Sequence, residues 1–135
     1  MPRWVLALSI VASVVAGCSK SDTVDVTGTV TMSGKPAENV QVTFNPKGAA
    51  RMATGVTDAN GRFALSTAKP NDGAMPGEYV VTLGEYYPPG KPPPLPPRGG
   101  LLPSRFPPKY GDPGQSPLTA TVAPEGKNDF PFDVK

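Results

Sequence analysis

The sequence predicts an all-β fold, a seven-stranded antiparallel β-sandwich. Three observations support this prediction. After residue 22, nearly every apolar run alternates with polar residues at a period of two, which is typical of strands with one buried face. Gly, Pro, Asn and Asp stand between these runs, where turns need them. The chain has 135 residues, which leaves room for one sandwich domain of roughly 110 residues after a short leader.

Each expected strand turns one row of apolar side chains inward. The strands cover residues 23–32, 40–44, 51–57, 63–65, 78–83, 118–122 and 129–134. The inward rows are Val24, Val26, Val30 and Met32; Val40, Val42 and Phe44; Phe63 and Leu65; Tyr79, Val81 and Leu83; Leu118, Ala120 and Val122; and Phe130, Phe132 and Val134. Pro131 has no N–H to donate to a neighbouring strand, so we expect either that the last strand lies at a sheet edge or that its proline occupies a non-bonded position of the ladder.

The stretch from Val56 to Leu65 contains the clearest turn. Asp58 and Asn60 can hydrogen-bond to nearby backbone, and Gly61 adopts φ > 0 without a Cβ clash. We therefore predict a hairpin between the strands on either side of this turn. In the first strand, Gly28 lies in phase with the apolar row, which predicts a bulge or a close approach to the opposite sheet.

A proline-rich insert, residues 85–103, interrupts the strand pattern. Pro88 to Pro97 contains seven prolines in ten residues. Proline lacks an N–H and holds φ near the polyproline II value, so no sheet continues through this segment. In the irregular chain that follows, Phe106 and Tyr110 are the expected anchors to the core.

Residues 1–17 have the pattern of a lipoprotein signal peptide, expected as a helix before the sandwich. Arg3 precedes an uncharged run of twelve residues that ends at Val15, and small residues lead to Cys18. Such a run is shorter than the roughly 20 apolar residues that a membrane-spanning helix needs. The stretch from Val15 to Cys18 resembles the lipobox of bacterial lipoproteins. That resemblance implies a diacylglyceryl group on the Cys18 thiol, cleavage just before Cys18, and a lipidated tether at residues 18–22.

The composition argues against an enzyme. The chain has no histidine and one cysteine, so the commonest general base and metal ligand is missing. Asp58-Ala-Asn60-Gly61 has the spacing of part of a calcium loop, but the remaining oxygen ligands do not follow. Without Arg3, 12 of the 13 basic residues face 11 acidic ones, a balance that does not favour nucleic acid. We expect no catalytic residue, no metal and no cofactor.

Several motifs together resemble the carboxypeptidase regulatory-like domain. They are Val26-Thr-Gly-Thr-Val30, Gly34-Lys-Pro36, Val40-Gln-Val-Thr-Phe44, Thr57-Asp-Ala-Asn-Gly-Arg-Phe63 and Gly77-Glu-Tyr-Val80, and the later Pro107-Pro-Lys-Tyr110, Leu118-Thr-Ala-Thr-Val122 and Asn128-Asp-Phe130. The resemblance covers residues 23–135 and implies a sandwich of the prealbumin-like (transthyretin-like) type. It also implies a non-catalytic accessory module. The proline-rich insert departs from the family pattern.

These observations lead to one hypothesis and one alternative for function. The hypothesis is a lipid-anchored extracytoplasmic module with a structural or protein-interaction role in the bacterial cell envelope. Cys18 would hold it to the cell membrane or the outer membrane. The alternative is a carbohydrate- or peptide-binding lipoprotein, whose partner is an envelope glycan or protein. The candidate residues of its binding surface are Tyr86, Tyr87, Leu95, Arg98 and Tyr110.

The proline run itself has two interpretations. Pro93-Pro-Leu-Pro96-Pro-Arg98 places two prolines three residues apart and an arginine after them, the pattern of polyproline ligands that dock in aromatic grooves. The same composition is typical of a stiff exposed spacer. Because such grooves belong mainly to cytoplasmic modules, a segment beyond a leader peptide favours the spacer.

Overall fold

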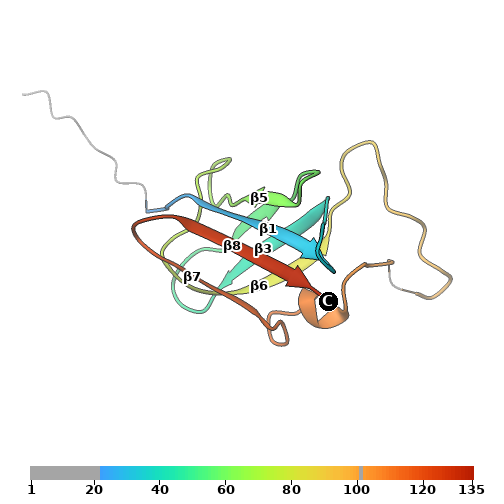
Figure 1. The fold of residues 1–135 in the computed structure, drawn as a ribbon. Helices are drawn as coiled ribbons and strands as arrows, with labels where there is room; N and C mark the ends of the chain where they lie inside the picture. Colours follow the sequence, from blue (N-terminus) through green and yellow to red (C-terminus); the bar gives the residue numbers. More distant parts are fainter. Residues whose placement is uncertain (1–21, 101) are drawn as a thin grey trace, which may run out of the picture.

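The computed structural model describes residues 22–100 and 102–135, which form two four-stranded sheets and one short 3-10 helix (Figure 1). The elements are β1 (Val26–Met32), β2 (Lys35–Pro36), β3 (Val40–Pro46), β4 (Ala53–Val56), β5 (Arg62–Ala64), β6 (Gly77–Glu85), η1 (Pro108–Gly111), β7 (Leu118–Val122) and β8 (Asn128–Val134). The all-β prediction is confirmed. The expected signal peptide at residues 1–17 and the expected lipid site at Cys18 lie outside the described residues. In the described ranges, no helix has the length and apolar character needed to cross a membrane.

The first sheet has the strand order β4-β3-β6-β7, and all its pairs are antiparallel. β3 and β6 form its centre, paired from Val40 opposite Glu85 to Pro46 opposite Tyr79. The predicted alternation holds here, because Phe44, Tyr79 and Val81 are fully buried. Burial on one face and polar residues on the other follow directly from the period of two.

The second sheet is built on β1, and one of its pairs is parallel. β8 lies alongside the whole of β1, from Val26 opposite Asn128 to Met32 opposite Val134. β5 and β2 pair antiparallel with β1. The prediction of a wholly antiparallel sandwich is therefore wrong at β1 and β8. After β7 the chain reverses and crosses to the other sheet, where β8 lies alongside β1 and runs in the same direction (Figure 1).

The described residues contain eight strands where the sequence predicted seven. The additional strand is β2, which pairs Lys35 with Met32 and Pro36 with Thr31. Ser33 and Gly34 both have positive φ, 51° and 80°, which makes the turn tight enough for a two-residue ladder to follow at once. Two exposed residues are too few to show an alternating pattern, so the sequence did not predict this strand.

The central turn has the predicted chemistry. The Asp58 carboxylate accepts hydrogen bonds from the backbone N–H of Asn60 at 2.9 Å and of Arg62 at 3.0 Å. Gly61 has φ of 73°, and a Cβ there would lie 2.6 Å from the carbonyl oxygen of Val30. The Asp58 oxygen that could have served a calcium loop is therefore part of the turn, as the sequence favoured.

The strands that flank this turn do not form the predicted hairpin. β4 pairs with β3 in one sheet, and β5 pairs with β1 in the other. An isolated bridge between Thr54 and Ser66 joins the two segments. The turn chemistry specifies a reversal of the chain, but it does not specify that the returning strand stays in the same sheet. Here the return strand brings Phe63 to β1.

The core between the sheets is organised around Phe44. Its ring centroid lies 5.6 Å from that of Tyr79, 5.8 Å from Phe130, 6.2 Å from Phe132 and 6.4 Å from Phe63. Three of these pairs are edge-to-face and the pair with Tyr79 is tilted, arrangements that aromatic rings prefer. Rings from both sheets therefore meet in one cluster.

Gly28 is needed within its own sheet. A Cβ at Gly28 would lie 2.4 Å from Cζ of Phe63 and 2.4 Å from the carbonyl oxygen of Phe130. Phe63 is its partner on β5 and Phe130 its partner on β8. The predicted bulge or close approach to the opposite sheet is not what requires this glycine. The ring of Phe63, on the neighbouring strand, occupies the space that a side chain at Gly28 would need.

β8 occupies the edge position that Pro131 predicts. In the part of the chain that the structure describes, β1 is the one strand that pairs with β8. Pro131 lies opposite Thr29 and is exposed, while Phe132 and Val134 are buried. The missing N–H of proline therefore costs no interior ladder bond.

Candidate functional site

The candidate site is the long connection between β6 and β7, residues 86–117, which we call the β6–β7 loop. It leaves the sandwich at the end opposite to the first described residues (Figure 1). Val24 is bridged to Ala74, just before β6 begins. At the other end of β6, the N–H of Tyr86 donates to the carbonyl oxygen of Asn39. The start of the domain and this loop therefore lie a full strand length apart.

The outer half of the β6–β7 loop is exposed along its length. Every residue from 89 to 100 is exposed, and the Leu95 side chain is 92% accessible. The last residue of β6 is Glu85, so the predicted insert at 85–103 began one residue early. Leu95 and Arg98 have the exposure that was expected of binding residues, but they extend away from the sandwich.

The returning half of the loop is fastened to the sandwich by two aromatic residues. Phe106 and Tyr110 are 6% and 7% exposed and belong to the core cluster. Tyr110 lies in η1, which packs on β6. The expectation that both residues act as anchors is confirmed. Tyr110, also predicted as a binding residue, is buried and does not line the cleft that contains Tyr86 and Tyr87.

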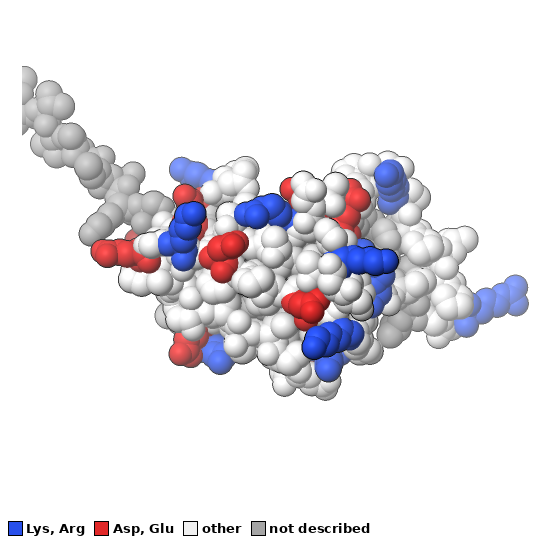
Figure 2. Space-filling model, viewed as in Figure 1, with Lys and Arg blue, Asp and Glu red and all other residues white. Residues whose placement is uncertain are grey.

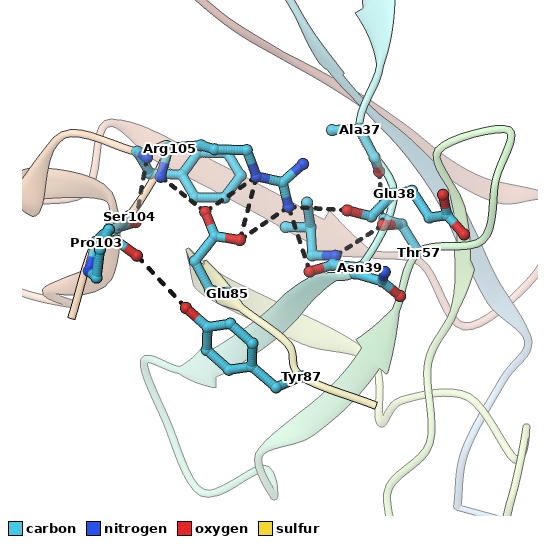
Figure 3. Close-up of polar contacts among 11 residues, drawn as sticks. Ala37, Glu38, Asn39, Thr57, Glu85, Tyr87, Pro103, Ser104 and Arg105 are labelled. Atoms are coloured by element: carbon cyan, nitrogen blue, oxygen red, sulfur yellow. Dashed lines mark hydrogen bonds and ion pairs between the residues drawn. The ribbon is translucent and has the colours of Figure 1, made fainter. Parts of the chain in front are cut away.

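A charged clamp closes the base of the loop (Figure 3). The guanidinium of Arg105 donates to both carboxylate oxygens of Glu85, over distances of 2.9 to 3.1 Å, and the Arg105 backbone N–H donates to the same carboxylate at 2.7 Å. Nη2 of Arg105 also reaches the carbonyl oxygens of Glu38 at 2.8 Å and Asn39 at 3.4 Å. This Glu85–Arg105 clamp ties together the end of β6, the return of the loop and the connection before β3.

The clamp carboxylate is mostly covered. The Glu85 side chain is 15% exposed and that of Arg105 is 41% exposed. Burial raises the pKa of Glu85, but the hydrogen bonds and charge of Arg105 outweigh burial and bring the pKa below its ordinary value of 4.5. The carboxylate is therefore ionised at neutral pH, and the pair remains charged on both sides.

A shallow cleft of about 340 Å³ lies beside the clamp. Tyr86 and Tyr87 line it, and both are half-buried. The Tyr87 hydroxyl donates to the carbonyl oxygen of Pro103 at 3.4 Å, across the mouth of the loop (Figure 3). The remaining lining residues are Glu38, Asn39, Glu85, Pro88, Lys91, Pro92 and Arg105. The two tyrosines predicted as a binding surface therefore do share one concave surface with the start of the proline run.

The loop carries positive charge. Residues 86–111 contain Lys91, Arg98, Arg105 and Lys109 and no acidic residue. Figure 2 shows Lys and Arg side chains at the outermost right of the molecule, where the loop extends. Arg105 is neutralised by Glu85, and the Lys109 ammonium lies 5.2 Å from the ring centroid of Tyr110. Lys91 and Arg98 give the outer part of the loop its charge.

Sequence reasoning missed the clamp. Glu85 ends an alternating strand and Arg105 lies 20 residues later, beyond the proline run and Arg98. No sequence signal singles out Arg105, because Lys91 and Arg98 lie nearer in sequence and could equally pair with Glu85. Only the folded position of Phe106, next to Arg105, selects the partner.

Comparison of the chain with protein-family models, with curated proteins and with solved structures finds no match. The resemblance to carboxypeptidase regulatory-like domains and the prealbumin-like type of sandwich therefore stay predictions from the motifs. Within residues 22–100 and 102–135, no group of three or more His, Cys, Asp or Glu side chains could hold a metal ion.

Proposed function

We propose that this protein is a lipid-anchored extracytoplasmic β-sandwich with a structural or protein-interaction role in the bacterial cell envelope, and that it has no catalytic activity. One observation carries the proposal. The first described residues and the exposed β6–β7 loop lie at opposite ends of the sandwich (Figure 1). A chain held to a membrane through its N-terminal end would present this loop away from the membrane.

The spacing between Cys18 and the sandwich supports this arrangement. The first backbone pairing of the domain is at Val24, six positions after Cys18. A fully extended chain spans at most about 3.5 Å per residue, which limits this tether to roughly 20 Å. The domain would stay close to the membrane surface, and the loop would then extend from its distal end.

Three carboxylates that are held by turns or by the clamp support a non-catalytic role. Asp58 accepts backbone N–H groups of the central turn, and Glu85 is held in the clamp. Asp72 accepts the backbone N–H groups of Thr67, Ala68 and Lys69, which lower its pKa. Groups used in this way stabilise loops and are poorly placed to move protons during a reaction.

A second candidate function rests on the cleft beside Tyr86 and Tyr87. Its volume of about 340 Å³ would admit one sugar ring or one peptide side chain. Aromatic rings and nearby polar groups are the usual contacts for such ligands. Carbohydrate or peptide binding is therefore the alternative. Titration of purified protein with envelope glycan fragments and with short peptides, followed by the intrinsic tyrosine fluorescence, would detect it.

The test of the anchor is intact-mass analysis of protein from the membrane fraction. We expect a mature chain that starts at Cys18 and carries acyl groups, because each buried CH₂ adds about 0.8 kcal/mol and two or more chains hold firmly. Cys18→Ser should release the protein or leave its precursor uncleaved. Ser19→Ala, one residue away, is the matched control and should stay in the membrane fraction. An unmodified Cys18 in soluble protein would contradict the proposal.

A further inference from the structure

The outer loop contains a segment whose composition favours a short rod. We call residues 91–98 the proline arm; it reads Lys-Pro-Pro-Pro-Leu-Pro-Pro-Arg. Five of its eight residues are prolines, which favour the polyproline II conformation with three residues per turn. Residues three apart then lie on one edge. Pro92, Leu95 and Arg98 share one edge, and Pro93 and Pro96 share a second.

The proline arm is bracketed by two turns. The N–H of Lys91 donates to the carbonyl oxygen of Pro88 at 3.0 Å, and the N–H of Gly100 donates to that of Pro97 at 2.8 Å. The third residue of each turn is a glycine with positive φ, 86° at Gly90 and 74° at Gly99, which is the pattern of type II turns. The arm is therefore a delimited segment with a turn at each end.

Leu95, the large apolar side chain of the proline arm, does not pack against the sandwich. Leu95 is 92% exposed and takes no part in the core cluster. All residues of the arm are exposed, and the described structure assigns no hydrogen bond or ion pair to the Arg98 side chain. In the polyproline II conformation Leu95 and Arg98 would lie on the same edge, about 9 Å apart at 3.1 Å per residue. An apolar contact and a cation at this spacing are available to a partner.

We propose that the proline arm is itself a ligand, which inserts into an aromatic-lined groove on a partner protein that also carries a carboxylate for Arg98. This inference rests on the proposed extracytoplasmic interaction role and identifies its contact segment. The edge of Pro92, Leu95 and Arg98 and the edge of Pro93 and Pro96 enter the groove. The third edge, Lys91, Pro94 and Pro97, faces solvent.

The chemistry of the arm favours a protein groove over a glycan. Its five prolines offer backbone carbonyl acceptors but no N–H donors, so the arm has few groups that could donate hydrogen bonds to sugar hydroxyls. Flat aromatic side chains instead pack on proline rings and on leucine without hydrogen bonds. Residues 86–111 include no acidic side chain, so the partner's complementary charge is negative.

The contacts at the base of the β6–β7 loop restrict the conformations of the proline arm before it binds. The Glu85–Arg105 clamp and the hydrogen bond from Tyr87 to Pro103 hold the two ends of the loop together. Prolines also remove backbone freedom before binding occurs. Less conformational entropy is then lost on docking than a flexible loop would lose.

The test uses the full-length protein in the bacterium that encodes it, with a photo-crosslinking amino acid at position 95. The matched control has the same amino acid at Met52, which is 56% exposed outside the loop. We expect a protein adduct from position 95, with crosslinked partner peptides that contain aromatic residues. Arg98→Glu should reduce this adduct at least tenfold, and the Met52 position should give none of it.

A second experiment compares substitutions on the proposed groove edges of the proline arm with a substitution on its solvent edge. The crosslinked partner, once purified, is titrated with a synthetic peptide of residues 88–100. Leu95→Ser and Arg98→Glu should each weaken binding at least tenfold, whereas Pro94→Ser on the solvent edge should change it less than about threefold. Equal losses from Leu95→Ser and Pro94→Ser would overturn the edge assignment and with it the proposal.

Other outcomes also overturn the proposal. They are the absence of an adduct at position 95, a glycan or lipid adduct in place of protein, and an adduct that Arg98→Glu leaves unchanged. Acylation of Cys18 in the same cells keeps these results distinct from a failure of the proposed function. An acylated, membrane-bound protein without an adduct leaves the anchor standing and removes the arm as a ligand.

Discussion

The two-sheet core and the β6–β7 loop are built on opposite principles. In the core, alternate side chains of β1, β3, β6 and β8 are buried, and rings from both sheets surround Phe44. In the loop, residues 89–100 bury nothing, and shape comes from proline geometry and two turns. Stability therefore resides in the core, while the accessible chemistry resides in the loop. Substitutions in each region should have correspondingly different effects.

The largest effect is expected for Phe63→Ala. The Phe63 side chain is 3% exposed, and its ring is stacked on Phe132 at 6.2 Å. Loss of a buried phenylalanine typically costs about 3–5 kcal/mol. Urea unfolding should give a free energy of unfolding that is lower by this amount, with a correspondingly lower midpoint. Leu95→Ala, which removes an equally apolar but exposed side chain, should leave the midpoint unchanged. Similar shifts for both would abolish the distinction between core and loop.

Gly61→Val should follow, with a loss of at least about 2 kcal/mol. Gly61 has φ of 73°, and a Cβ would lie 2.6 Å from the backbone oxygen of Val30. Gly90→Val is the matched control, because Gly90 has φ of 86° but open space around it. The control should lose only the backbone strain, about 1–2 kcal/mol locally, and much less in global stability because its loop is exposed. A Gly61→Val midpoint equal to that of the wild type would show that the turn is not essential.

The Glu85–Arg105 clamp should have an intermediate effect that depends on pH. Glu85→Gln should cost about 1 kcal/mol at neutral pH, the upper end for a partly exposed ion pair. The lowered pKa of Glu85 gives the sign. Stabilisation is complete above the ordinary value of 4.5 and is lost as the pH falls through the lowered value.

Unfolding measured at about pH 7 and about pH 3 tests this sign. The difference between wild type and Glu85→Gln should be about 1 kcal/mol at the higher pH and smaller at the lower one. Glu125→Gln, at an exposed turn, is the control and should show little difference at either pH. A Glu85→Gln difference that grows as the pH falls would contradict the clamp.

The smallest effect is expected when residues 88–98 are replaced by a short Gly/Ser loop. The removed segment contributes little buried surface, and loop-closure entropy varies slowly with length. The free energy of unfolding should change by less than about 0.5 kcal/mol. Tyr87, Arg105, Phe106 and Tyr110 stay in place in this variant. A loss greater than about 2 kcal/mol would mean that the proline arm packs on the sandwich.

The burial pattern was predictable because it is local. Alternation placed Val42, Phe44, Tyr79 and Val81 inward without knowledge of their neighbours, since successive side chains of a strand point to opposite faces. Pro131 likewise predicted an edge strand, because its missing N–H acts at its own position. In both cases one residue and its immediate neighbours carry the whole physical cause.

The pairing of strands was not predictable in the same way. The turn at Asp58 and Gly61 reverses the chain, yet β4 and β5 belong to different sheets. Any strand with an apolar row can pair with any other, because the backbone groups are the same in all of them. The choice depends on which aromatic rings fit together around Phe44, and that fit exists only in the assembled core.

The candidate site divides along the same line. By itself the sequence determined the exposure and stiffness of residues 88–98, because proline fixes φ and removes the N–H wherever it stands. The tertiary structure decided that Tyr110 is buried and that Arg105, rather than Lys91 or Arg98, pairs with Glu85. Phe106 and Tyr110 pack into the core and bring Arg105 to the end of β6. An ion pair between residues far apart in sequence forms only where packing has already placed its two members together.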